Sequence, residues 1–166
     1  MNIAIIGKYV NLKDAYKSLD EALVHGGIYN NLKVNLIRVE SDNLKPSDIK
    51  KKLKNVSAIL IPGGFGKRGT EGKIEAIKYA RQNKIPFLGI CYGMQMAVIE
   101  YARNVLKIKK ATSSEFSKTG VNVIGLIHEW NRDGKILKGS KKELGGTMRL
   151  GLYEACLLYT SDAADE

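Results

Sequence analysis

The sequence predicts an α/β fold in which a mainly parallel sheet is flanked by helices. Short apolar runs of strand length alternate with stretches in which apolar residues recur at helical spacing. Such alternation implies right-handed crossovers and a sheet covered on both faces. Two glycine-containing turns follow predicted strands, where ligands gather in sheets of this kind. We therefore expect the functional site at the carboxyl ends of the strands.

The predicted elements follow one another from residue 2 to about residue 105. Residues 2–7 form the first strand, and residues 14–25 form a helix that Gly26 and Gly27 end. The further elements are a strand at 32–39, a basic helix opened by Pro46 and Ser47, a strand at 57–61, a helix containing Ile74, Ile77 and Ala80, a strand at 84–90, and a helix on which Met94, Ala97, Val98, Tyr101 and Val105 recur.

Length, cysteine content, charge and apolar runs limit the kinds of protein that this chain can be. A chain of 166 residues suits one domain with a real core, and its two cysteines give no disulfide framework. The net charge of +10 comes largely from lysines clustered at 50–54, 107–110 and 141–142 without interleaved aromatic residues, which indicates solvated faces. No apolar run has transmembrane length, and the residues at Met1 do not show the charged-then-apolar pattern expected of a leader. We expect a cytoplasmic protein without a nucleic-acid or membrane partner.

A glycine-rich loop follows the strand at 57–61. It reads Pro62, Gly63, Gly64, Phe65, Gly66, Lys67, Arg68 and Gly69. Backbone amides exposed by glycines suit either a phosphate cradle or an oxyanion hole. The loop lacks the GxxxxGK[ST] spacing, and the chain has no GxGxxG, so the phosphate alternative is the weaker one.

Cys91 lies between the apolar strand at 84–90 and the next helix, within a Gly-x-Cys-x-Gly turn. This pattern matches the nucleophile elbow, in which glycines permit a sharp, strained bend that presents the reactive atom. A cysteine between a strand and a helix can also be an inert core residue. The surrounding motifs decide between these two interpretations.

With both turns in hand, the chain resembles the class I glutamine amidotransferases, and among them the glutaminase domains of the CTP synthase family. The resemblance covers roughly the first 155 residues. It rests on LKDAYKS at 12–18, PGGFGKRG at 62–69, GKIEAIKYAR at 72–81, IPFLGICYGMQ at 85–95, ATSSEF at 111–116 and GGTMRLG at 145–151. The GMP synthase type shares the elbow and the glycine loop and is the alternative within the family.

The resemblance implies a flavodoxin-like layered fold and a role for each matching residue. Cys91 would attack the side-chain amide of L-glutamine, and amides at Gly63, Gly64 and Tyr92 would hold the oxyanion. Tyr92, Gly93, Met94 and Gln95 would line the glutamine pocket. Glu115 and Arg149 would face the α-amino and α-carboxylate groups of the substrate.

The resemblance also implies ligands and partners. The glutaminase domain needs no metal and no cofactor, whereas GTP as an activator would contact Phe65. A synthetase domain that binds UTP, ATP and Mg²⁺ and forms a homotetramer would complete the enzyme. We expect residues 1–155 to be a partial glutaminase domain.

The chain departs from the family pattern after residue 151. The family takes its catalytic base from a His-x-Glu pair beyond GGTMRLG, whereas the two histidines here, His25 and His128, match other segments. Residues 156–166, which include Cys156, resemble no family segment and are expected to be aberrant sequence. We therefore expect a C-terminally incomplete domain with little activity alone.

Two further functions stay open on the sequence. The chain would also suit a non-catalytic module that binds glutamine or docks on a separate synthetase subunit of a split amidotransferase. A different cysteine hydrolase on the same scaffold is the third interpretation.

Overall fold

The computed structural model describes residues 1–8, 14–42, 44–126, 129–132 and 135–138. The chain divides into two compact units, Met1–Gly125 and Leu126–Glu166. The first unit contains the predicted α/β arrangement. The second contains a short hairpin.

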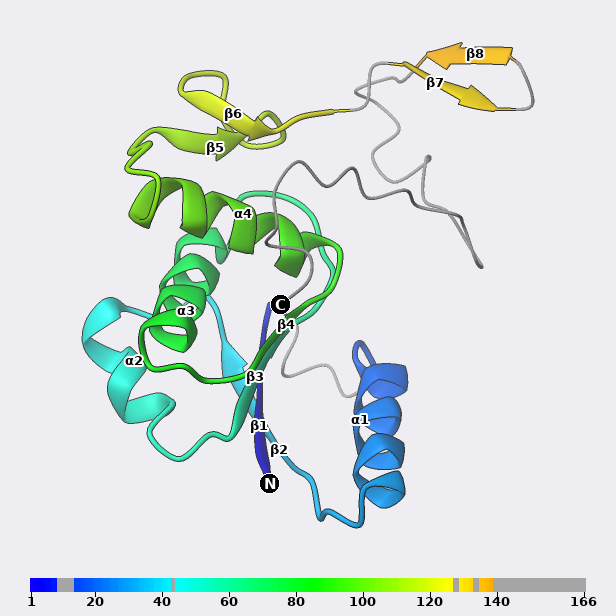
Figure 1. The fold of residues 1–166 in the computed structure, drawn as a ribbon, viewed down its shortest axis with the longest axis vertical. Helices are drawn as coiled ribbons and strands as arrows, with labels where there is room; N and C mark the ends of the chain where they lie inside the picture. The colour runs from blue at the N-terminus through cyan, green and yellow to red at the C-terminus, as the bar shows by residue number, and fades with distance from the viewer. Residues whose placement is uncertain (9–13, 43, 127–128, 133–134, 139–166) are drawn as a thin grey trace, which may run out of the picture. The chain divides into compact units, whose positions relative to one another are not determined.

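A four-stranded parallel sheet forms the centre of the first unit. Its strands are β1 (Asn2–Gly7), β2 (Asn35–Glu40), β3 (Ala58–Ile61) and β4 (Phe87–Gly89), in the order β2-β1-β3-β4. Every neighbouring pair runs parallel. Figure 1 shows α1 (Lys17–Tyr29) on one side of this sheet and α2 (Pro46–Lys52), α3 (Thr70–Gln82) and α4 (Tyr92–Asn104) on the other. The predicted fold class is confirmed.

Helix α1 runs further than the sequence predicted. Gly26 and Gly27 lie inside it, and the helix ends at Tyr29, where the Asn30 side-chain amide donates to the Gly26 carbonyl at 2.8 Å. A methyl group at Gly27 would lie 2.5 Å from Val34 Cγ2. Gly27 therefore serves close packing against the next segment, and the expectation that it stops the helix was wrong.

Two strands begin later than predicted because the preceding residues complete helix ends. Leu32 donates its amide to the Gly27 carbonyl, so it belongs to the turn after α1 and β2 begins at Asn35. Ile85 likewise donates to the Ala80 carbonyl, and Lys84 has a φ of +53°. These residues close the C-terminal turn of α3, which leaves Phe87–Gly89 for β4.

The core lies between the sheet and the helices α2, α3 and α4. The sheet contributes Ala4, Ile6, Val39, Ile59 and Ile61, and the helices contribute Ile49, Ile74, Ala76, Ile77, Ala80, Tyr92, Met96 and Ile99. Burial of this apolar surface fixes α4 against β3 and β4. The position of Cys91 therefore depends on a packed core.

Further strands pair outside the main sheet. Strand β5 (Ala111–Ser113) pairs in parallel with β6 (Val121–Ile124). In the second unit, β7 (Glu129–Arg132) and β8 (Lys135–Lys138) form an antiparallel hairpin. No helix in the described part of the chain has the length and apolar character needed to span a membrane.

Candidate active site

Cys91 occupies the sharp turn between β4 and α4. Its φ of +50° and ψ of −102° place it in a region that non-glycine residues rarely adopt, and its side chain is exposed. Such a conformation costs on the order of 1–3 kcal/mol and persists only where the surroundings impose it. The elbow geometry predicted from the Gly-x-Cys-x-Gly pattern is present, and the inert core interpretation of this cysteine is wrong.

The glycines of the elbow act through their missing side chains. A methyl group at Gly93 would collide with the Ile61 carbonyl oxygen, and one at Gly89 would lie 2.6 Å from the Met94 nitrogen. Neither glycine has a positive φ, whereas Cys91 does. The strained bend is thus located at the cysteine itself, and the glycines let the first turn of α4 press against β3 and β4.

The glycine loop lies beside the elbow at the carboxyl end of the sheet. A Cβ placed on Gly63 would lie 3.8 Å from Cys91 Cβ, and the space around a Cβ on Gly64 is open. The Ile90 amide donates to the Ile61 carbonyl at 3.0 Å, which ties the residue after β4 to the last residue of β3. The structure therefore brings the predicted oxyanion loop and the predicted nucleophile into one place. Phe65, on the same loop, is about half exposed at 51%.

Three side chains from distant segments hold this loop. Lys8 Nζ donates to the Phe65 carbonyl at 2.5 Å and to the Gly66 carbonyl at 3.2 Å. The Tyr92 hydroxyl donates to the same Gly66 carbonyl at 2.5 Å. The Gly66 amide donates to Glu115 Oε1 at 2.5 Å. Glu115, whose predicted contact with the substrate stays a prediction, therefore contacts the loop.

Sequence reasoning missed Lys8 as a site residue. It follows the first strand directly, within the segment Gly7, Lys8 and Tyr9, so its place at the carboxyl end of a strand was the available signal. Its side chain is buried, and burial lowers its pKa, as does the nearby charge of Arg68, while Asp42 and Glu115 raise it. That signal marks Lys8 as a candidate site residue, but it does not predict that the lysine is buried.

A second buried lysine, Lys73, lies near the Tyr92 ring. Lys73 Nζ is 5.3 Å from the centroid of the Tyr92 ring, and Lys8 Nζ is 5.5 Å from it. Burial, followed by the charge of Lys8, lowers the pKa of Lys73 to about 8. Burial raises the pKa of Tyr92, which keeps its phenol protonated as a donor. The ring of Tyr92 gives both ammonium groups a favourable neighbour.

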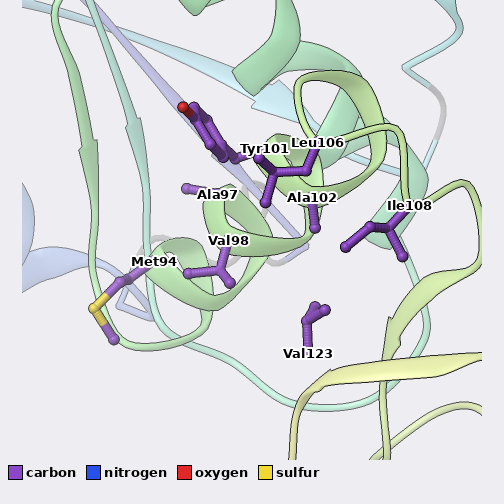
Figure 2. Close-up of a pocket in the computed structure, with 8 residues that line it drawn as sticks. All are labelled: Met94, Ala97, Val98, Tyr101, Ala102, Leu106, Ile108 and Val123. Atoms are coloured by element: carbon purple, nitrogen blue, oxygen red, sulfur yellow. The ribbon is translucent and has the colours of Figure 1, made fainter.

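The face of α4 identified from the sequence is mostly the exposed one. Met94, Val98 and Tyr101 are 57%, 43% and 50% exposed, whereas Tyr92, Met96 and Ile99 are buried. Met94 lies at one end of an apolar cavity of about 400 Å³, shown in Figure 2. The cavity is lined by Met94, Ala97, Val98, Tyr101, Ala102, Leu106, Ile108 and Val123. Gln95 is half-buried in the first turn of α4, where its backbone N–H donates to the Cys91 carbonyl.

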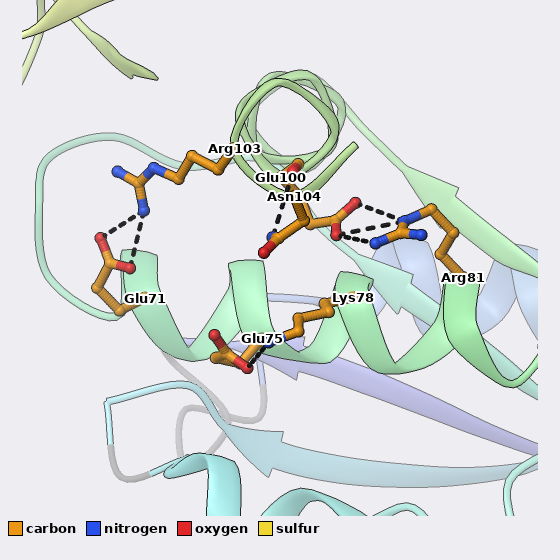
Figure 3. A network of polar contacts seen from close by, with 7 residues as sticks. All are labelled: Glu71, Glu75, Lys78, Arg81, Glu100, Arg103 and Asn104. Carbon is orange, nitrogen blue, oxygen red and sulfur yellow. Dashed lines mark hydrogen bonds and ion pairs between the residues drawn. The ribbon is translucent and has the colours of Figure 1, made fainter. Parts of the chain in front are cut away.

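Ion pairs fix α4 against α3, as Figure 3 shows. Glu100 is 1% exposed and receives hydrogen bonds from Arg81 Nη2 at 2.7 Å and from Arg81 Nε at 3.0 Å. Arg103 Nη1 pairs with Glu71 at 2.9 Å and its Nε donates to the Ala111 carbonyl. The helix that carries the elbow is thus held to α3 by polar contacts along its length.

Several predicted residues lie outside the described residues. These are Arg149, His128, Cys156 and the rest of the segment 156–166, together with the proposed domain boundary at residue 155. Their assignments stay predictions. His25, the other histidine, is exposed on α1.

Comparison with known families adds an independent observation. The model of the family "Glutamine amidotransferase class-I" matches residues 11–164. The chain belongs to this family. The class I amidotransferase fold and the elbow geometry therefore agree with the family assignment.

This amidotransferase chain is similar to part of several CTP synthases. CTP synthase of Pelagibacter ubique (strain HTCC1062) is 74% identical over 157 residues, which are 95% of this chain and 29% of that protein. CTP synthase of Zymomonas mobilis (strain ATCC 31821 / ZM4 / CP4) is 53% identical over 168 residues, which are 99% of this chain and 31% of that protein. The chain spans about 30% of the length of these curated relatives.

A solved structure supports the same placement. The glutaminase domain of Trypanosoma brucei CTPS with bound acivicin matches with a TM-score of 0.72 and 36% identity, covering 76% of this chain and 50% of that one. The similarity of this amidotransferase chain to CTP synthases and to a CTPS glutaminase domain favours the CTP synthase interpretation over the GMP synthase type.

Proposed function

We propose that this chain hydrolyses L-glutamine and delivers the ammonia to a synthetase domain that aminates UTP to CTP. The observation that carries the proposal is the exposed thiol of Cys91 on a strained elbow beside Gly63. An exposed cysteine at a helix N-terminus, next to a glycine-rich loop, is suited to acyl transfer. The names of the relatives supply the acceptor chemistry.

The reaction begins with attack of the Cys91 thiolate on the side-chain amide carbon of glutamine. A carbon–sulfur bond forms, and the carbonyl oxygen gains negative charge that the amides of Gly64 and Tyr92 stabilise. The oxyanion then collapses, the carbon–nitrogen bond breaks, and the leaving nitrogen takes up one proton, equivalent to the proton that the Cys91 thiol lost on ionising, so that ammonia is released. Water attacks the glutamyl thioester, which gives glutamate and restores the thiol.

Charged side chains of the protein recognise the α-amino and α-carboxylate groups of glutamine. Glu115 lies beside the loop, where its carboxylate suits the α-amino group of glutamine. Arg149 is assigned to the α-carboxylate on the family pattern alone. Gln95 and the first turn of α4 complete the pocket around the side-chain amide.

The proposal assigns the remaining ligands and partners to the longer enzyme. ATP and Mg²⁺ would act in the synthetase domain. GTP would contact Phe65, whose half-exposed ring offers a face for a purine. We place the enzyme in the cytoplasm as a homotetramer.

Ammonia release from glutamine tests the proposal. The purified chain and its Cys91→Ala variant are compared, with and without added synthetase domain from a CTP synthase. The proposal predicts Cys91-dependent ammonia release in the presence of the synthetase domain. Equal rates with and without the thiol would contradict it, and robust release by the chain alone would contradict the low activity expected from the sequence.

A further inference from the structure

The peptide group between Phe65 and Gly66 is held from two opposite directions. Its carbonyl oxygen accepts from Lys8 Nζ at 2.5 Å, and its N–H donates to Glu115 Oε1 at 2.5 Å. Among the described residues all peptide bonds are trans, so the C=O and N–H of this planar group point away from each other. A cation therefore fixes one edge of the peptide, and an anion fixes the other.

The charges match the polarity of the peptide group they touch. The ammonium meets the negative end of the peptide dipole and the carboxylate meets the positive end, so both are charge-assisted hydrogen bonds. Lys8 is 8% exposed, and bonds of this kind are stronger where water is excluded. Rotation of the peptide plane by half a turn would replace both bonds with like-polarity contacts.

The next carbonyl along the loop is fixed as well. Gly66 O accepts from the Tyr92 hydroxyl at 2.5 Å and from Lys8 Nζ at 3.2 Å. Gly66 itself has a φ of +76°, a conformation that favours glycine. Tyr92 directly follows Cys91, so its side chain joins the loop to the residue next to the nucleophile.

We propose that Lys8, together with the Tyr92 hydroxyl, is a positioning residue that fixes the glycine loop so that its amides face the Cys91 thiol. This inference rests on the proposed glutaminase function. Lys8 acts through the Phe65 and Gly66 carbonyls and does not touch the substrate. A loop left free to rotate would lose the alignment of its oxyanion donors, and loss of one such donor costs about a hundredfold in rate.

Glu115 connects the fixed peptide group between Phe65 and Gly66 to glutamine binding. A carboxylate accepts through both oxygens, so the bond from Gly66 to Oε1 is compatible with a second bond from the α-amino group of glutamine to Oε2. Substrate binding and loop orientation then share one side chain. Lys8 completes the arrangement from the other edge of the peptide.

The test uses Lys8→Met, Tyr92→Phe and a matched control, Lys51→Met, which removes an exposed lysine on α2. Hydrogen exchange of the loop at residues 62–69 is measured by mass spectrometry in each protein. We expect exchange in Lys8→Met to be about tenfold faster or more, a smaller increase in Tyr92→Phe, and no change in Lys51→Met. Unchanged exchange in both loop variants would overturn the proposal. Because Tyr92→Phe retains the ring in the core, it keeps the test decisive if Lys8→Met does not fold.

Kinetics give a second readout wherever the wild type releases ammonia. Loss of a positioning residue lowers kcat by about tenfold or more and changes KM by less than about threefold, because the misaligned donors act in the transition state. Equal losses in kcat from Lys51→Met, or a loss confined to KM, would contradict the assignment. A wild type without Cys91-dependent activity would overturn the proposed function. The exchange measurement would still test whether Lys8 and Tyr92 fix the glycine loop.

Discussion

The buried carboxylate of Glu100 on α4 is held by the guanidinium of Arg81 at the end of α3. The carboxylate is 1% exposed and the arginine is 37% exposed, so the pair reaches from the core to the surface. Its geometry is bidentate, with Nη2 and Nε both donating. Because α4 begins at the elbow, this pair helps to set the position of Cys91.

Arg81→Met is expected to destabilise the protein strongly. The substitution removes the main partner of the Glu100 carboxylate, which is 1% exposed, and broken buried pairs cost about 3–5 kcal/mol. Urea denaturation measures the loss. Glu71→Gln provides the control, since Glu71 is 72% exposed and its pair with Arg103 is expected to contribute under about 1 kcal/mol. Similar losses in the two variants would show that the burial of Glu100 has no energetic effect.

Gly93→Ala is expected to disrupt the elbow. The added methyl group meets the Ile61 carbonyl oxygen on β3, a backbone atom that can move only with the sheet. Overpacking of this kind costs about 1–3 kcal/mol or more, and it would displace the first turn of α4. Thermal unfolding and the rate of Cys91 alkylation by iodoacetamide report the two effects.

Gly26→Ala is the matched control for that experiment. Gly26 lies inside α1, and a methyl group there meets no atom within 4 Å. Alanine in a helix interior is favoured over glycine by about 0.5–1 kcal/mol. We expect this variant to melt at a higher temperature than the wild type and to leave Cys91 alkylation unchanged.

Stability is expected to rise with pH above pH 8 because of Lys73. Its pKa falls from an ordinary value of 10.5 to about 8 in the folded chain, so the unfolded chain binds this proton more tightly. The resulting penalty is fully present below pH 8 and disappears as the pH rises towards 10.5. The lowered pKa of Lys8 acts in the same direction.

Denaturation by urea between about pH 7 and about pH 9.5 measures this slope. Above pH 10 the raised pKa of Tyr92 acts in the opposite direction, since the unfolded phenol ionises first. Lys73→Met should flatten the slope, whereas Lys51→Met should retain it. A wild type whose stability falls over this range would contradict the lowered pKa of Lys73.

The elements and the elbow were predictable from local patterns. Strand runs such as residues 2–7 and the turn at Gly89–Gly93 carry their signal within a few neighbouring residues. Helix and strand ends were less predictable, because Leu32 and Ile85 close helix turns through backbone bonds that periodicity does not reveal.

The buried charges could not be predicted in the same way. Lys8, Lys73 and Glu100 are buried because each contacts a partner from a segment that is distant in the sequence. No local sequence pattern identifies those partners. The same holds for α4, where an apolar run at helical spacing marked the cavity face with Met94 and Val98. The fully buried face holds Met96 and Glu100 instead. Because that face contains a charged residue, apolar periodicity alone does not identify it as the buried face.

Covalent labelling of Cys91 by acivicin, the compound bound in the T. brucei glutaminase domain, tests most directly whether this thiol is the nucleophile of a glutamine site. Peptide mapping by mass spectrometry locates the adduct, and glutamine is added as a competitor. We expect one adduct per chain on Cys91, slowed by glutamine and unaffected by an equal concentration of another amino acid. Failure to label Cys91, or labelling that glutamine does not slow, would contradict the assignment.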